Sequence, residues 1–312
     1  MSAASRTASW APSWINGPFA APEIPDASPF ADAQLRLRWE DIAQDGRIML
    51  TALAPAIGWT VWGGLLRNHE GMVAAGKLGV ISILSRLTAS GTDEPLRVVE
   101  PVASRGTYEL AHGADADGKV ERLFMNAWVE MRGARGRMVP PEGPGPEVLA
   151  GRLFVEHTFT RMLAPPDQRK VVRFDVPGMP EVPAARYAQP APRTAMELPP
   201  GATPIDDGYL PDPALTCFGL EHTDSNQHVN SLVYPRLFVE AALRRLDVLG
   251  RDRKVLVRHL DIAYRKPCFA NDRVRVHLRL FELDGRVGAA GFLVADGEPL
   301  DRPRVYARIL LA

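Results

Sequence analysis

The sequence of 312 residues contains only two cysteines, Cys217 and Cys268. Two cysteines are too few for the disulfide framework of a secreted domain, and their scarcity favours a reducing, cytoplasmic location. No apolar run approaches the ~20 residues that a membrane-spanning helix needs. Residues 1–14 also lack the charged start and apolar core of a signal peptide. We therefore expect a chain that is neither secreted nor membrane-spanning.

The chain also lacks a charge bias, because its 37 basic residues balance its 37 acidic residues. A balanced composition disfavours nucleic acid as a partner. His222 lies close to Asp224 and could suggest a metal-binding pair. No Cys-x-x-Cys or His-x-x-x-His spacing supports such a site. We therefore expect no metal and no cofactor. With 46% hydrophobic residues, the length is sufficient for two domains, each with its own core.

The order of apolar patterns predicts two similar halves. Residues 1–30 are rich in proline and small side chains, which predicts an extended or partly disordered arm. In residues 31–163 we expect a strand at 35–39, a helix from Ile48 to Leu66 that Pro55 bends or begins, and strands at Val80–Leu87, Val98–Leu110, Val120–Arg132 and Leu153–Met162.

Prolines recur throughout residues 164–213, which predicts an extended linker over the surface and a domain boundary. Residues 214–312 then repeat the order of the first half. The expected elements are a strand at Leu215–Leu220, a helix at Val229–Leu246, and strands at Val255–Tyr264, Arg273–Phe281, Val287–Val294 and Val305–Leu311.

The segment Asp224-Ser225-Asn226-Gln227-His228-Val229-Asn230 stands directly before the second helix. A helix N-terminus offers free N–H groups and a partial positive charge that polarise a substrate carbonyl, while neighbouring side chains manage a water or a proton. This arrangement indicates acyl chemistry. Alternatively, Asp224 and Asn226 simply cap the helix, as such residues often do.

This segment resembles the active-site loop of the hotdog-fold thioesterases, and among them the acyl-carrier-protein thioesterases, which reads Asp-x-Asn-x-His-Val-Asn-Asn with a Tyr shortly after it. The matching residues are Asp224, Asn226, His228, Val229, Asn230 and Tyr234, and Ser231 replaces the second Asn. Residues 262–268 are similar to the family's second motif, Tyr-Arg-Arg-Glu-Cys. There Cys268 is kept and Pro267 stands in place of Glu.

The resemblance implies an α+β tandem hotdog fold, with two antiparallel sheets, each wrapped round one central helix, joined edge to edge as a pseudo-dimer that is able to form a homodimer. It also implies a thioester hydrolase that releases a fatty or polyketide acyl chain from acyl carrier protein or coenzyme A. Two other classes stay open. One is a hotdog hydratase or dehydratase, whose loop we expect to read Asp-x-Asn-Pro-x-His; the other is a non-catalytic acyl-binding accessory protein.

Within this family reading, His228 is the expected general base, and Asn226 orients its imidazole or the attacking water. Asp224 bonds the loop, holds the imidazole tautomer or takes the proton itself. Backbone N–H groups around Val229 and Asn230 polarise the carbonyl, and Tyr234 belongs to the same substrate-binding set. Cys268 has two equally supported interpretations, a nucleophile that works with His228 and Asn226, or a small buried packing residue.

Three further features complete the sequence-based expectations. Laying residues 43–48 over 224–229 puts Ala43 opposite Asp224 and Arg47 opposite His228, which predicts one working site and one degenerate copy. Glu240 has helical ion-pair spacing to arginines, so we assign it to a salt bridge. The stretch from residue 236 to 279 is locally basic, which fits either a docking surface for an acidic carrier protein or ordinary solvated faces.

Overall fold

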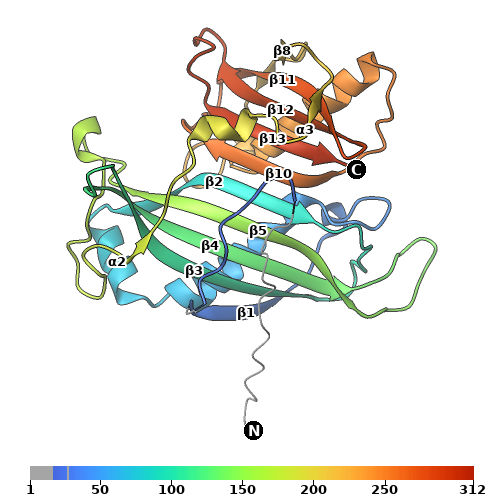
Figure 1. Cartoon of the computed structure of the whole chain (residues 1–312). Helices are drawn as coiled ribbons and strands as arrows, with labels where there is room; N and C mark the ends of the chain where they lie inside the picture. The colour runs from blue at the N-terminus through green and yellow to red at the C-terminus, as the bar shows by residue number, and fades with distance from the viewer. Residues whose placement is uncertain (1–16, 27) are drawn as a thin grey trace.

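The computed structural model describes residues 17–26 and 28–312. They form one 13-stranded sheet, in the order β1-β3-β4-β5-β2-β10-β13-β12-β11-β7 (Figure 1). The long strands are β1 (Phe30–Leu35), β2 (Ile81–Gly91), β3 (Val102–Ala114), β4 (Val120–Ala134), β5 (Glu147–Thr160), β10 (Val257–Tyr264), β11 (Arg273–Leu283), β12 (Arg286–Ala295) and β13 (Val305–Leu311). Their pairings are all antiparallel, so the chain is α+β as expected.

The two halves of the chain meet where β2 pairs with β10, and Figure 1 shows these two strands side by side. The pairing runs from His259 opposite Ser90 to Ala263 opposite Arg86. Next to this seam Arg86 and Asp261 form a buried ion pair of 2.6 Å, which Arg308 joins at 2.9 Å. Because a buried charge is costly without a partner, this cluster disfavours any other register between the halves.

Each half places helical residues on one face of the sheet. In the first half these are η2 (Leu50–Leu53), α1 (Pro55–Ile57), the π-helical η3 (Gly58–Leu66) and α2 (Glu70–Lys77); in the second half they are α3 (Val233–Val248). The expected helix Ile48–Leu66 is therefore present but changes from 3-10 to α to π turns. Pro55 occupies the first turn of α1, where its missing N–H costs nothing.

Two expectations need correction. The strand expected at residues 35–39 is β1, which ends at Leu35, and Trp39–Asp41 form the 3-10 turn η1. The reason is that β1 pairs with β3 from Phe30 onward, so it begins at the last residue of the expected arm and ends where the expected strand starts. Residues 1–16 and 27 of that arm lie outside the described residues. The preceding segment packs onto the sheet, where Phe19 is buried.

Residues 164–213, the expected linker, carry only short elements: β6 (Ala185–Arg186), β7 (Thr203–Pro204), β8 (Leu210–Pro211), η4 (Pro166–Gln168) and η5 (Pro192–Met196). β9 (Thr216–Cys217) and η6 (Leu220–His222) follow this segment. β7 and β8 pair along the edge of β11, while η5 packs on the sheet face opposite α3. Tyr187 packs edge-on against Phe124 at 5.3 Å between ring centroids and donates a hydrogen bond to the buried Glu156. The prolines therefore keep this segment extended while it seals the outer face of β4 and β5.

A bulge in β2 controls which side chains face the first helix. The pairing with β5 shifts between Leu84 and Arg86, so Ser85 is the extra residue. As a result Leu84 stands opposite His157 and Leu87 stands opposite Val155, although the two leucines are three positions apart in the sequence. Strand alternation alone would put the leucines on opposite faces. The bulge instead brings both to the helix side.

Candidate active site

The segment before α3 is a tight, hydrogen-bonded loop. Thr223 and Val229 form an isolated bridge, and the N–H of Asp224 donates to the carbonyl of His228 at 3.1 Å. Gln227 closes the turn with a φ of +66°, a left-handed conformation that is uncommon for a residue with a side chain. The loop therefore holds Asp224 and His228 at the two ends of one turn, close to each other.

Asp224 is the centre of the polar contacts in this loop. One of its oxygens accepts the N–H of Asn226 at 2.8 Å, and the other accepts Nδ2 of Asn230 at 3.3 Å. Nδ1 of His228 lies 4.0 Å from the first oxygen and 3.3 Å from the carbonyl oxygen of Val229. The side chains of Asp224 and His228 are 26% and 31% exposed, so solvent reaches both.

Asn230 connects this loop to the start of the helix. Its Oδ1 accepts the N–H of Leu232 at 2.9 Å while its Nδ2 reaches Asp224. Leu232 is the N-cap of α3 and no side chain caps the helix, so Asp224 and Asn226 do not have the capping role that the sequence suggested. Asn226 is exposed, and its side chain makes no hydrogen bond within the described residues.

Two of the N–H groups in the expected donor region are already bonded. The N–H of Val229 donates to the carbonyl of Cys268 at 2.8 Å, and the N–H of Asn230 donates to the carbonyl of His222 at 2.9 Å. The N–H of Ser231 has no partner in the part of the chain that the structure describes. The Ser231 carbonyl, in the next peptide unit, accepts a hydrogen bond from Oη of Tyr264 at 3.0 Å.

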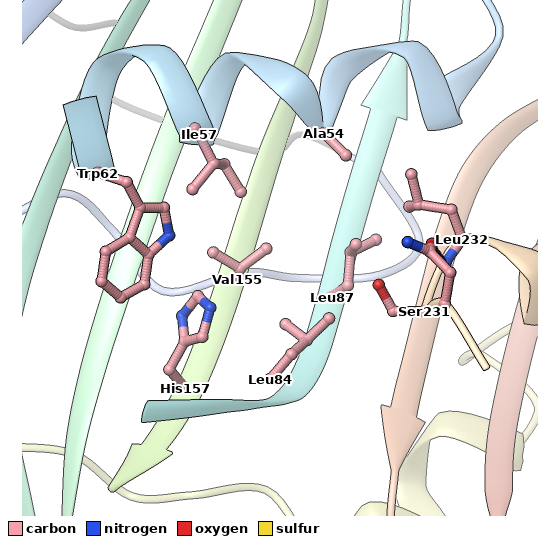
Figure 2. Close-up of a pocket in the computed structure, with 11 residues that line it drawn as sticks. Ala54, Ile57, Trp62, Leu84, Leu87, Val155, His157, Ser231 and Leu232 are labelled. Atoms are coloured by element: carbon pink, nitrogen blue, oxygen red, sulfur yellow. Dashed lines mark hydrogen bonds between the residues drawn. The ribbon is translucent and has the colours of Figure 1, made fainter. Parts of the chain in front are cut away.

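Beside Asn230 and Ser231 lies a cavity of about 210 Å³ (Figure 2). Its lining comes from the first helix (Ala54, Ile57, Gly58, Trp62), from β2 and β5 (Leu84, Leu87, Val155, His157) and from the second half (Asn230, Ser231, Leu232). Most of the lining side chains are apolar, while His157 and the loop residues Asn230 and Ser231 supply polar groups. Such a site suits an apolar chain that ends in a polar, reactive group.

Sequence reasoning missed the strand residues of this cavity, above all His157. The motif search looked for polar residues near helix starts, and nothing in the pattern of β5 separates His157 from neighbours that pack on the sheet. The bulge at Ser85, which brings Leu84 beside His157, also has no signal in the sequence. Trp62 contacts His157 edge-on, with ring centroids 5.8 Å apart.

Solved structures of acyl thioesterases share this architecture along nearly the whole chain. A putative oleoyl thioesterase from Lactobacillus plantarum matches with a TM-score of 0.56 and 14% identity, over 92% of this chain and 96% of that one. An acyl-ACP thioesterase from Bacteroides thetaiotaomicron matches with 0.57 and 12%, over 91% and 98%. A 12:0-ACP thioesterase from Umbellularia californica matches with 0.56 and 12%, over 91% and 94%.

The chain has the fold of the acyl-ACP thioesterases. No protein-family model matches it, and no curated protein matches it in sequence. At these identities the likeness covers the fold, and the functional argument rests on the loop and the cavity.

Within this thioesterase fold, Cys268 and Tyr234 are buried behind the loop. Cys268 is fully buried and follows the end of β10 by four residues, so it lies in a loop and not on the strand. Its N–H donates to Oη of Tyr234 at 3.1 Å. Burial raises the pKa of the Cys268 thiol above its ordinary value. No contact joins Cys268 to His228 or Asn226 within the described residues.

The remaining polar candidates have structural partners. Glu240 pairs with Arg236 at 2.9 Å, as its helical spacing predicted. Nδ1 of His222 accepts the N–H of Gly219 at 2.9 Å, which stabilises η6. The described residues contain no cluster of three or more His, Cys, Asp or Glu side chains that would hold a metal. No helix among them is long and apolar enough to cross a membrane.

The locally basic stretch is largely neutralised by carboxylates. The pairs are Arg244–Asp212, Arg245–Asp206, Arg251–Glu282, Arg253–Asp247, Lys266–Glu298 and Arg273–Asp296. Several of these carboxylates come from the linker and from β11, which the sequence analysis did not place beside the helix. The structure therefore favours ordinary paired faces over a positive docking surface here.

Proposed function

We propose that this protein is a thioester hydrolase that releases an acyl chain from a carrier. The observation that carries the proposal is that Asn230 and Ser231, from the loop that holds Asp224 and His228, line the apolar cavity of the first half. Apolar space for the acyl chain and polar groups for its carbonyl thus meet at one place.

In the proposed reaction the acyl chain occupies the cavity and its carbonyl lies at Ser231. The N–H of Ser231 and the second hydrogen of Asn230 Nδ2 stabilise the oxyanion. His228 takes a proton from water, which attacks the carbonyl carbon, and the carboxylate of Asp224 favours the resulting imidazolium. The tetrahedral intermediate then collapses, the C–S bond breaks, and the proton goes to the thiolate that leaves.

Direct attack by water is preferred to an acyl-enzyme on Cys268. The reactive form of cysteine is the thiolate, and burial disfavours it at Cys268 because its thiol pKa is raised. Since Cys268 is 0% exposed, a substrate also has no route to its sulfur without displacing the loop.

The tandem hotdog arrangement belongs to the same proposal. In it, residues 31–163 form a first hotdog unit that holds the acyl chain, residues 164–213 form the linker, and residues 214–312 form a second unit that carries the catalytic loop. The carrier is acyl carrier protein or coenzyme A. The cavity, about 210 Å³, is smaller than ordinary ligand sites of roughly 300–1,000 Å³, which favours a short acyl chain.

The test is a panel of acyl-carrier-protein and acyl-CoA thioesters of increasing length, with free thiol and free acid measured together. We expect equal release of both products and a maximum at short chains. Water addition to an enoyl thioester without thiol release would instead indicate a hydratase. Saturable acyl binding with no turnover of any thioester would indicate an accessory protein and would refute the hydrolase.

A further inference from the structure

Ser231 carries a second unpaired polar group besides its backbone N–H. Its hydroxyl makes no hydrogen bond within the described residues, and it is not one of the buried side-chain atoms that lack a partner there. Ser231 is half-buried and lines the cavity, and Figure 2 shows its hydroxyl oxygen pointing inward, on the side of Leu84 and Leu87. The hydroxyl is therefore open to a group inside the cavity.

The fold does not use this hydroxyl. A serine near the start of a helix commonly turns its hydroxyl onto a backbone N–H, which satisfies one of the free donors there. Here Oδ1 of Asn230 accepts the N–H of Leu232 at 2.9 Å, and no side chain caps α3 itself. The hydroxyl of Ser231 is therefore left for a partner from outside the chain.

The peptide units on both sides of Ser231 are hydrogen-bonded. The carbonyl of Asn230 accepts the N–H of Val233 at 3.0 Å, and the carbonyl of Ser231 accepts a hydrogen bond from Oη of Tyr264 at 3.0 Å. Of the polar groups of Ser231, the N–H and the hydroxyl lack partners within the described residues. Because these two groups are joined only through Cα and Cβ, they lie close together on a bonded backbone.

We propose that Ser231 selects acyl chains that carry an oxygen close to the thioester, on the second or third carbon, and that the Ser231 hydroxyl donates a hydrogen bond to that oxygen. This inference rests on the proposed function, in which the N–H of Ser231 binds the carbonyl oxygen. A substituent that the neighbouring hydroxyl reaches must therefore lie close to that carbonyl along the chain. In this role Ser231 determines specificity through its side chain, separately from its N–H.

The selectivity follows from what a plain chain does to the hydroxyl. Methylene groups beside Ser231 displace water from the hydroxyl and offer it no partner, and a covered polar group without a partner costs free energy. A keto or hydroxyl oxygen on the chain restores the bond, because both accept a hydrogen from the serine. An ordinary hydrogen bond between neutral groups corresponds to a roughly three- to tenfold change in affinity.

The experiment measures kcat/KM for coenzyme A thioesters of one short chain length, unsubstituted or with an oxygen on the second, third or fifth carbon. The wild-type protein is expected to prefer the second or third position over the plain chain. Since such an oxygen also changes the reactivity of the carbonyl, the quantity compared is the preference ratio of each variant relative to wild type.

Substitutions of Ser231 test whether the hydroxyl causes the preference. Ser231→Ala should lower the preference ratio roughly three- to tenfold, whereas Ser231→Thr keeps a hydroxyl and should retain most of it. The matched control is Ser225→Ala, because Ser225 is exposed on the same loop and does not line the cavity. Its preference ratio should equal that of wild type.

Carba analogues, in which a methylene replaces the thioester sulfur, separate this inference from the proposed function, because calorimetry measures their binding without turnover. Hydrolysis with a ratio that Ser231→Ala leaves unchanged, or a preference for the fifth carbon alone, would overturn the role of the hydroxyl and leave the hydrolase intact. Analogue binding that prefers the second or third position and depends on the Ser231 hydroxyl, in a protein that hydrolyses no thioester, would support the selection and refute the hydrolase.

Discussion

The loops at residues 43–49 and 224–230 share one backbone conformation but carry different side chains. In the first, the N–H of Ala43 donates to Arg47 and the N–H of Gly46 to Ala43, each at 2.9 Å; in the second, Asp224 and Gln227 make the same bonds at 3.1 and 2.9 Å. Both loops contain a left-handed residue, Gly46 or Gln227, and both close with a bridge. The overlay made from sequence therefore has the correct register.

The side chains of the two loops act differently. Arg47, in the place of His228, pairs with Asp45 at 2.8 Å and with Asp93 at 3.1 Å, and also donates to the carbonyl of Ala312. It fastens the loop to the end of the chain and leaves no group to accept a proton. The same turn therefore forms with Arg47 or with His228 at the equivalent position. A loop of this shape is not by itself a catalytic site.

The helices that follow the two loops also differ: the first borders the cavity, and the second is packed into the core. The first carries Gly58, whose added Cβ would meet nothing within 4 Å, and it borders the cavity. The second, α3, buries Tyr234, Leu237 and Phe238 in the core. In the proposed reaction, one half therefore keeps space for a substrate and the other supplies the reacting groups.

The largest expected effect comes from removing His228. His228→Ala should lower kcat/KM for thioester hydrolysis by a factor on the order of 10²–10⁴, the ordinary contribution of a positioned acid–base group. The side chain is partly exposed, so thermal unfolding should change little. Near-native turnover in a folded variant would show that the two loops do not differ in chemistry.

The next effect tests the difference between the helices. Gly58→Leu should fill cavity space and lower kcat/KM for the longest accepted chains by roughly 10–200-fold for each methylene refused. Gly76→Leu on α2 is the matched control, since its Cβ also meets nothing within 4 Å and it does not line the cavity. An unchanged length profile for Gly58→Leu would place the acyl chain elsewhere.

Cys268→Ala separates the two interpretations of that residue. We expect activity within a few-fold of wild type, a modest loss of stability from the small cavity left behind, and no acyl adduct by intact mass after rapid quench. Cys217→Ala, at an exposed position, is the control. An adduct at Cys268, or loss of activity in both Cys268→Ala and Cys268→Ser, would instead support the interpretation of Cys268 as a nucleophile.

The parts of the molecule that depend on periodicity and local turns were predictable from sequence. The strands from β2 to β4 and from β10 to β13 and the helix α3 were placed within four residues at each end, whereas β5 begins at Glu147, six residues before its expected start. The repeat gave the paired loops. What depended on contacts distant in sequence was not predictable. Neither the bulge at Ser85 nor the N–H of Val229 donating to Cys268 has a local signal, so the cavity and the carbonyl donor emerged only from the fold.

The smallest expected effect comes from replacing Arg47, and this variant tests directly whether the two loops differ in function. Arg47→Ala removes two partly exposed ion pairs, each contributing about 0–1 kcal/mol, and one hydrogen bond to Ala312. The free energy of unfolding, measured in urea, should therefore fall by about 1 kcal/mol. The hydrolysis rate should stay within a few-fold, because the lining of the cavity does not include Arg47. If Arg47→Ala abolished hydrolysis while the folded protein kept an intact His228 loop, both loops would take part in catalysis, and the division into a substrate half and a reacting half would be wrong.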